Sequence, residues 1–209
     1  VADRINYNRD RERNSVPDTL DKEIVRDAAR FLNDGEKMQL SYAVQNTHRT
    51  VGTRTSSHIV QNFGMRNSLQ PDHLTVKLKG SAGQSLGAFA APGLKIEVSG
   101  DANDYVGKGL SGGIIVVRPP MASPLKASDN TIIGNTVLYG ATDGLLFAAG
   151  RAGERFAVRN SGAKVVVEGC GSNGCEYMTG GVAVVLGTIG ANFGAGMTGG
   201  MAYIYDPNE

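Results

Sequence analysis

The sequence has no tryptophan, only 7 tyrosines and 6 phenylalanines, and only 2 cysteines. Such sparse aromatic content leaves no stacking platform for single-stranded nucleic acid, and two cysteines do not make a disulfide framework. The net charge of +1 gives no long-range field for nucleic acid or an anionic membrane. No apolar run reaches the roughly 20 residues of a membrane span, and the start lacks a signal-peptide pattern. These absences predict a folded protein in a reducing, cytosolic compartment.

Glycine, by contrast, is abundant, with 29 of the 209 residues, most of them after residue 80. The distribution has no collagen triplet, so it indicates many tight turns, where glycine adopts positive φ at little cost. The turns alternate with short aliphatic runs that recur at a nearly constant spacing. These runs begin at residues 74, 93, 113, 144, 163, 181 and 200, with steps of 19, 20, 31, 19, 18 and 19 residues.

A fixed period of this size is the signature of a solenoid, in which each unit stacks on its neighbours. The one long step contains the proline-rich stretch 119–124, so it is a normal coil with a loop of about twelve residues. A coil of about nineteen residues holds two or three short strands. The sequence therefore predicts an all-β fold, a single-stranded right-handed parallel β-helix of about seven coils over residues 36–209.

The first strand is predicted around 38–44, where apolar and polar residues alternate. Apolar residues of later strands are expected to point inward and to stack into ladders, each burying roughly 1.5–3 kcal/mol worth of surface. The expected inward residues include Ile115, Val117, Val165, Val167, Val182, Val184 and Leu186. The chain starts without Met and shows no cap after its last strand, although solenoid ends need one. We therefore expect a piece of a larger protein.

Residues 1–35 are predicted to form an N-terminal arm and a capping helix. Residues 1–18 are polar and carry four arginines, which favours an arm lying on a partner over a nucleic-acid tail. Residues 19–33 are the only predicted helix, with Asp18 or Thr19 as its N-cap. We expect this helix to cover the first coil. Unchanged stability and parent activity after deletion of the whole unit would contradict that expectation.

Three segments match the pattern G-x-G-x-x-G, namely Gly107–Gly112, Gly169–Gly174 and Gly194–Gly199. In a dinucleotide-binding fold this motif lies between a strand and a helix whose N-terminus faces the pyrophosphate. Here the first and third segments lead into aliphatic strands, and no helical pattern follows any of the three. Two of the three segments also occupy the same phase of the repeat. We interpret them as turn glycines at the corners of coils, and predict no cofactor-binding residue in this chain.

The cysteines and histidines do not form a recognisable metal motif. Cys170 and Cys175 have no second pair, and the histidines His48, His58 and His73 lie far away in the sequence. A closed zinc site needs four ligands, and a plant-type iron–sulfur site needs further cysteines. His73 follows a proline and an aspartate and is interpreted as a surface turn residue. We predict no metal ligands and two free thiols near a turn.

No catalytic constellation is recognisable either, and the nucleophile pattern G-x-S-x-G is absent. Asp101 and Asp104 could act as paired carboxylates, but their segment is also a typical turn sequence. The polar pairs Glu154-Arg155 and Arg159-Asn160 alternate with Phe156 and Val158. That alternation predicts an outward face that meets another domain. We predict no catalytic residue in this chain.

Several long strings nevertheless resemble one family. They are Gly80–Phe89, Gly100–Gly113, Ile133–Thr142, Gly153–Gly162 and Gly174–Gly181, and they occur in the order found in that family. Together they closely resemble the C-terminal glycine-rich domain of the large (α) subunit of glutamate synthase. Thr47–Gly52 is similar to the family's entry to its first coils, so the likeness covers nearly the whole chain after residue 35. Cys170 is a departure from the commoner family sequence, which often lacks a cysteine at this position.

The resemblance implies a structural, non-catalytic β-helix within an enzyme that makes two L-glutamates from L-glutamine and 2-oxoglutarate. In that family a cysteine nucleophile releases ammonia, which travels to an FMN site beside an iron–sulfur cluster. The β-helix packs against the glutaminase and synthase domains and holds their placement, and no catalytic, cofactor or metal residue carries over to this chain. FAD and NADPH are implied through a small partner subunit, and the location is bacterial cytoplasm or plastid stroma.

Two alternatives belong to other functional classes. A glycine-rich β-helix of similar pattern also occurs in formylmethanofuran dehydrogenase, so the chain could be a stand-alone scaffold subunit of another redox complex. The strings Gly80–Gln84 and Asp104–Gly109 favour glutamate synthase over that alternative. Saturable binding of FMN, NADPH or zinc to the chain would instead indicate a nucleotide- or metal-binding enzyme. We expect no such binding.

Overall fold

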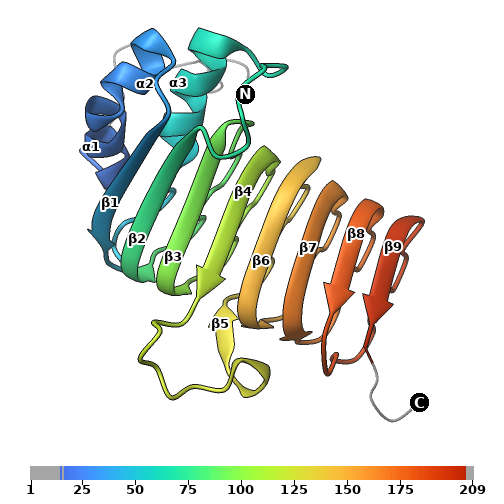
Figure 1. The fold of residues 1–209 in the computed structure, drawn as a ribbon. Coiled ribbons are helices and arrows are strands. Elements are labelled where there is room, and N and C mark those ends of the chain that lie inside the picture. The colour runs from blue at the N-terminus through green and yellow to red at the C-terminus, as the bar shows by residue number, and fades with distance from the viewer. Residues whose placement is uncertain (1–14, 16, 206–209) are drawn as a thin grey trace, which may run out of the picture.

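The computed structural model describes residue 15 and residues 17–205. It is a parallel β-solenoid of about seven turns, with α-helices gathered at its N-terminal end (Figure 1). The helices are α1 (Leu20–Asp27), α2 (Ala29–Asp34), α3 (Thr53–Phe63) and the short 3-10 helix η2 (Ala127–Asp129). The strands are β1 (Met38–Val44), β2 (Leu74–Ala82), β3 (Leu94–Ala102), β4 (Ser111–Arg118), β5 (Thr131–Ile133), β6 (Asp143–Ala152), β7 (Ser161–Cys170), β8 (Thr179–Val185) and β9 (Gly199–Ile204).

The strands form one parallel sheet in the order β1-β2-β3-β4-β6-β7-β8-β9, and β5 pairs with β3 and β6. The pairing reproduces the period predicted from the sequence. For example, Leu145 pairs with Lys164, Lys164 pairs with Val182, and Val182 pairs with Met201. The long step between β4 and β6 carries η2 and β5, which lie on the loop beneath the sheet (Figure 1). The predicted parallel solenoid and its extra loop are therefore confirmed.

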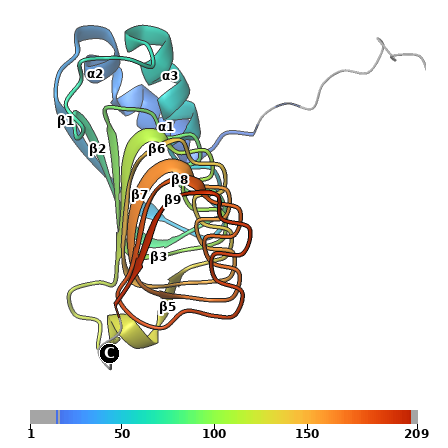
Figure 2. The same cartoon turned by 90° about the vertical axis from the view of Figure 1, so that its right-hand side faces the viewer.

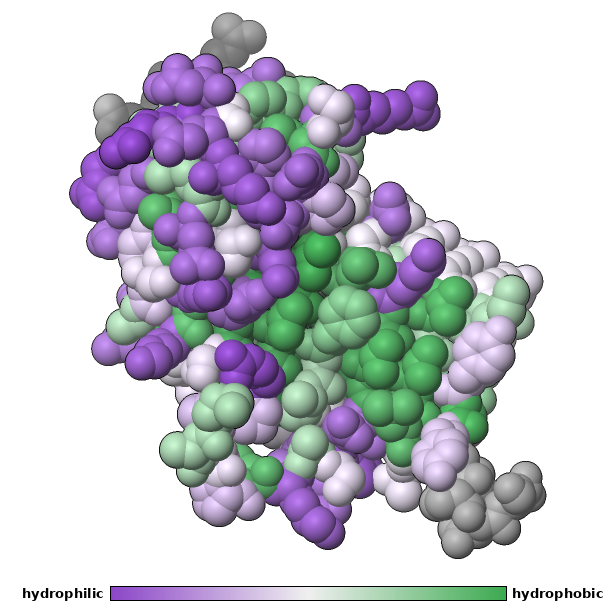
Figure 3. All heavy atoms as spheres, in the orientation of Figure 1, coloured by the Kyte–Doolittle hydropathy of each residue, from purple (hydrophilic) through white to green (hydrophobic). Residues whose placement is uncertain are grey.

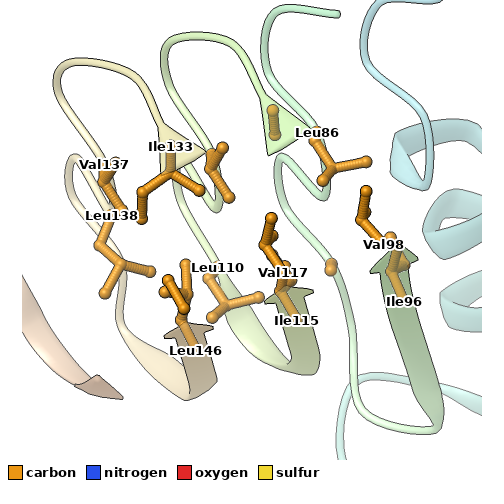
Figure 4. Close-up of a cluster of buried hydrophobic side chains, with 14 of the residues drawn as sticks. Leu86, Ile96, Val98, Leu110, Ile115, Val117, Ile133, Val137, Leu138 and Leu146 are labelled. Atoms are coloured by element: carbon orange, nitrogen blue, oxygen red, sulfur yellow. The ribbon is translucent and has the colours of Figure 1, made fainter. Parts of the chain in front are cut away.

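Inward side chains of the strands stack in two apolar ladders, as the sequence predicted. One ladder contains Leu40, Val76, Ile96, Ile115, Leu146, Val165, Ala183 and Ala202. The second runs two residues further along each strand and includes Val98, Val117 and Val167. In Figure 4 the strand residue Leu146 lies opposite Leu138 of the other wall, and both are fully buried, so the core fills the inside of the coils.

The expected inward set was wrong in β8. Ala183 and Val185 are buried there, whereas Val182 and Val184 are half-buried and Leu186 is 44% exposed. The reason is the shorter step into β8: Val165 pairs with Ala183, so the neighbouring valines fall on the outer face. A shift of one residue moves a whole strand pattern to the other face of a sheet.

The opposite wall of each coil consists of turns rather than the second or third strand predicted from coil length. In these turns every second residue has positive φ, as at Ser85, Gly87 and Phe89 with values of 64°, 63° and 57°. We call these segments the turn wall, and they comprise residues 85–89, 105–109, 136–140, 155–159, 173–177 and 192–196. Figure 2 shows the strands on one side of the solenoid and these turns on the other.

Backbone hydrogen bonds join the turns into ladders along the solenoid. Gly107 N donates back to Leu86 O of the preceding coil at 2.9 Å, while Tyr105 N donates forward to Asn135 O at 2.8 Å. Because the same alternation recurs from coil to coil, each turn is bonded to both of its neighbours. The turn wall thus satisfies its backbone groups without adopting strand geometry.

The N-terminal region contains more helix than the sequence suggested. The predicted helix 19–33 is two helices, because the buried Ala28 has ψ of 13°, far from the helical value of about −42°. A further helix, α3, was missed and replaces the uninterrupted strand–turn pattern expected after β1. Ile24, Phe31 and Ile59 are fully buried in the same core cluster as the first coils. The helices therefore pack against the first coils. Of the arm predicted over residues 1–18, residues 1–14 and 16 lie outside the described part of the chain.

An aspartate of α1 caps α3 from a distance. Gly52, at the N-cap position of α3, has φ of 99° and no side chain to offer. The carboxylate of Asp21 takes that role: it accepts hydrogen bonds from Arg54 N at 2.6 Å and Thr55 Oγ1 at 2.5 Å. Asp21 is only 2% exposed, and burial raises the pKa of its carboxyl group despite these hydrogen bonds.

Candidate functional site

The three G-x-G-x-x-G segments lie in the solenoid walls and none opens a helix. Gly107 and Gly109 have φ of 65° and 61°, and Gly194 and Gly196 have φ of 70° and 66°, so both pairs occupy equivalent positions of the turn wall. The shared phase predicted from the sequence is thus confirmed. A side chain at Gly109 would overlap the ring of Phe89, and one at Gly196 would overlap the ring of Tyr177. The second glycine of each pair makes room for an aromatic ring of the preceding coil. The Gly169–Gly174 segment follows a strand end instead.

Cys170 and Cys175 are free thiols inside the coils, and both are 0% exposed. Burial raises the pKa of the Cys170 thiol to about 11 and that of Cys175 to about 12. A thiolate is the reactive and metal-binding form, so neither thiol is suited to nucleophilic or metal chemistry at neutral pH.

Alkylation by iodoacetamide should therefore be very slow for both thiols in the native protein. A pKa increase of two units alone lowers the thiolate fraction about 100-fold, and burial slows access further. We expect complete labelling in urea and on the order of 100-fold slower labelling without it, measured by mass spectrometry at pH 8. Native labelling of Cys170 or Cys175 at the unfolded rate would show that the coil interior opens readily.

His48 and His73 make separate structural contacts rather than a common site. His73 is half-buried, not a surface residue as predicted: its Nε2 lies 2.8 Å from Gly35 O, and its ring lies 5.7 Å from that of Phe31. His48 Nδ1 accepts a hydrogen bond from Gln45 N at 3.2 Å. Within the part of the chain that the structure describes, no three or more His, Cys, Asp or Glu side chains gather to hold a metal ion.

The candidate carboxylates bond to neighbouring coils: Asp104 lies in a turn as predicted, whereas Asp101 lies in strand β3. Asp104 Oδ1 accepts a hydrogen bond from Asn135 N of the next coil at 2.7 Å, and Asp101 accepts one from Ser81 Oγ at 2.9 Å. The predicted outward position of Asn160 is wrong. Its amide is fully buried and binds the backbone of Ala163 through both its nitrogen and its oxygen.

The outer face of the sheet changes in character along the solenoid. In one outward row of paired residues, Lys77 and Glu97 are followed by Val116, Phe147, Val166, Val184 and Tyr203. The neighbouring row contains Ile114, Leu145, Val182 and Met201, and it is interrupted by the exposed Lys164 between Leu145 and Val182. We call these nine apolar residues of β4 to β9 the outer apolar face; Figure 3 shows it as a broad hydrophobic region beyond the polar N-terminal part.

Side chains on this face have much larger exposed fractions than core residues have. Phe147 is 42% exposed, Tyr203 55% and Met201 57%. Contiguous apolar patches of this kind on soluble proteins mark sites of interaction. The face is therefore the strongest candidate functional site on the strand wall. Sequence reasoning assigned these positions to the interior or left them unassigned, because aliphatic runs carry no signal that tells one face from the other.

Comparisons with known proteins agree with this fold. A family profile described as "GXGXG motif" matches residues 21–209. The large chain of an NADPH glutamate synthase from Azospirillum brasilense is 73% identical over 194 residues, which are 93% of this chain and 13% of that protein. An NADH glutamate synthase from Schizosaccharomyces pombe is 50% identical over 200 residues, 96% of this chain and 9% of that protein. Ferredoxin-dependent glutamate synthase 2 from Synechocystis sp. is 52% identical over 189 residues, 90% of this chain and 12% of that protein.

The paired glycines of the turn wall and the single parallel sheet define a β-solenoid domain of the glycine-rich type. The chain belongs to the GXGXG motif family, and the three relatives described above are glutamate synthases. The resemblance seen in the sequence is therefore confirmed. The chain spans between 9% and 13% of the length of these three relatives. Among the described residues, no helix is both long and apolar enough to cross a membrane.

Proposed function

We propose that this chain is the structural, non-catalytic domain of a glutamate synthase, an oxidoreductase that makes two L-glutamates from L-glutamine, 2-oxoglutarate and a reductant. The domain positions the glutaminase domain and the FMN synthase domain of the same large subunit, so that ammonia can pass between them. Its location is bacterial cytoplasm or plastid stroma. The relatives differ in the electron donor named, and the 73% identity to an NADPH enzyme favours NADPH.

The observation that carries the proposal is the outer apolar face. A stack of hydrogen-bonded coils is rigid, and its core is already filled by the inward ladders, so the exposed apolar rows have no role inside the solenoid. Burial against neighbouring domains would remove them from water at about 25 cal/mol per Å². A rigid domain that is held by a broad apolar contact is able to fix the distance between the glutaminase and synthase active sites.

The described residues do not fit the cofactors of such an enzyme. The two thiols are separated from solvent, and they have no further cysteine with which to hold an iron–sulfur cluster. In two of the segments that resemble a phosphate loop, the second glycine, Gly109 or Gly196, lies against an aromatic ring of the preceding coil. FMN and the iron–sulfur cluster are therefore assigned to other parts of the large subunit, and FAD and NADPH to a small partner subunit.

The test is Phe147→Glu in the intact large subunit. A carboxylate placed in an apolar contact without a partner costs several kcal/mol, so we expect glutamine-dependent glutamate synthesis to fall by at least about tenfold. Ammonia release from glutamine should fall less, because the glutaminase site itself is untouched. Both rates can be measured on the same preparation, with free ammonia recording the loss of channelling.

Lys77→Glu is the matched control, since it places the same carboxylate in the same outward row at its charged end. We expect synthesis within about twofold of wild type for this variant, because the position is solvated. Wild-type synthesis and undiminished channelling in Phe147→Glu, in a domain that remains folded, would show that this face does not hold the neighbouring domains.

A further inference from the structure

We propose that the turn wall carries a second docking surface, a cationic groove that binds an extended acidic segment from another part of the glutamate synthase assembly. This inference rests on the proposed function for the assembly to which the chain belongs. The residues that support it lie on the turn wall, opposite the outer apolar face. The groove has a volume of about 740 Å³. Its principal lining residues are Tyr105, Lys108, Tyr139, Arg155, Arg159 and Tyr177.

The positive charges of the groove are not paired with carboxylates of the described residues. Lys108, Arg155 and Arg159 take part in no ion pair and no side-chain hydrogen bond with the described residues. The six ion pairs of the described part all lie elsewhere. Glu176 is the one carboxylate that lines the groove, against these three cations. Such an excess of unpaired positive charge complements an acidic partner, and it sets the orientation and specificity of docking.

Aromatic rings lie between these charges. Tyr139 is 37% exposed and Tyr177 is 54% exposed, and Lys108 Nζ lies 5.8 Å above the ring of Tyr105. Tyrosine and arginine are the residue types enriched where protein surfaces bind strongly, because they combine broad apolar contact with hydrogen-bonding groups. Gly140, beside Tyr139, has no atom within 4 Å of the place where a side chain would begin, so the wall there is open to an incoming residue.

The shape of the groove indicates an extended occupant. Its lining begins at Gln84 and ends at Tyr177, and these residues belong to coils four steps apart. Neighbouring coils in a parallel sheet are about 4.8 Å apart, which gives a length of about 19 Å, or about six residues of extended chain. The net charge of only +1 provides no long-range attraction for a nucleic acid, so a short acidic peptide segment fits better.

The test is zero-length cross-linking of the intact enzyme assembly with a water-soluble carbodiimide. The reagent joins the Lys108 amine to an adjacent carboxylate as an amide and takes up the water as a urea. We expect mass spectrometry to find a peptide containing Lys108 joined to a segment rich in Asp or Glu from outside residues 1–209. Lys108→Arg removes the reactive amine and should abolish that cross-link, while cross-links at Lys77 continue.

The double variant Arg155→Gln, Arg159→Gln tests the groove without altering the cross-linked lysine. We expect the yield of the Lys108 cross-link to fall about fivefold to tenfold, because two exposed charge pairs are lost. Phe147→Glu should leave this yield unchanged if the walls dock independently, so failure of the proposed function is recognised separately. A cross-link from Lys108 only to Glu176, or an unchanged yield in the double variant, would overturn the proposal.

Discussion

Gly162→Ala is expected to lower the free energy of unfolding by about 3 kcal/mol or more. The reason is the close stacking of consecutive coils at the start of β7. A Cβ atom at Gly162 would overlap the carbonyl oxygen of Thr142 in the preceding coil. That oxygen belongs to backbone and not to a side chain that can rotate away, so the coils would have to separate and strain the neighbouring hydrogen bonds. Urea unfolding followed by circular dichroism measures the change.

Gly140→Ala is the control that separates this overlap from the general cost of replacing glycine. Gly140 has φ of 63°, but no atom lies within 4 Å of its missing Cβ. Only the left-handed backbone opposes alanine there, at about 1–2 kcal/mol. A cost for Gly162→Ala no greater than that for Gly140→Ala would show that close stacking of coils does not require glycine.

The strand wall could be predicted from the sequence because its signal is local. Each strand is a short aliphatic run after a glycine, and the spacing of the runs gives the register directly. The face of β8 could not be predicted, because Ala183 between Val182 and Val184 gives no contrast between buried and exposed positions. Only the pairing of Ala183 with Val165 decides which side faces inward.

The turn wall was predicted only in part. Glycine at positions such as Gly107 and Gly109 indicated positive φ, and that expectation is correct. The same conformation, however, is adopted by Tyr105, Arg155 and Arg159, whose residue types give no such signal. Stacking and hydrogen bonds to adjacent coils impose it on them. The cationic groove was missed for this reason: its residues are scattered in sequence and are brought together only by the coil period.

Helix α3 was missed because its determinants are not local. Its first residues are threonine, arginine and serine, which include weak helix formers, and Gly52 before them has no side chain to accept a capping hydrogen bond. The capping carboxylate is Asp21, which lies in another helix and about thirty residues earlier in the chain. Propensity therefore argued against a helix that a tertiary contact stabilises.

Asp21→Ala should consequently destabilise the N-terminal helices by about 3 kcal/mol, since it leaves the partly buried amide of Arg54 and the buried hydroxyl of Thr55 without their acceptor. Asp21→Asn retains an acceptor oxygen and should cost about 1 kcal/mol. Asp18→Ala is the control: its pairing with Lys22 is fully exposed, so its loss should leave the free energy of unfolding essentially unchanged. Equal effects for Asp21→Ala and Asp18→Ala would exclude the proposed cap.

The pH dependence of these variants tests the electrostatic account of the same carboxylate. Burial raises the folded-state pKa of Asp21 above its ordinary value of 3.8, so the folded protein holds this proton more tightly than the unfolded chain. Stability from protonated Asp21 is fully present below 3.8 and is lost as pH rises through the raised pKa. Wild type should therefore lose stability relative to Asp21→Asn as pH rises through that window, and the difference should level off above it. An opposite slope in urea titrations would mean that hydrogen bonding to the ionised carboxylate outweighs its burial.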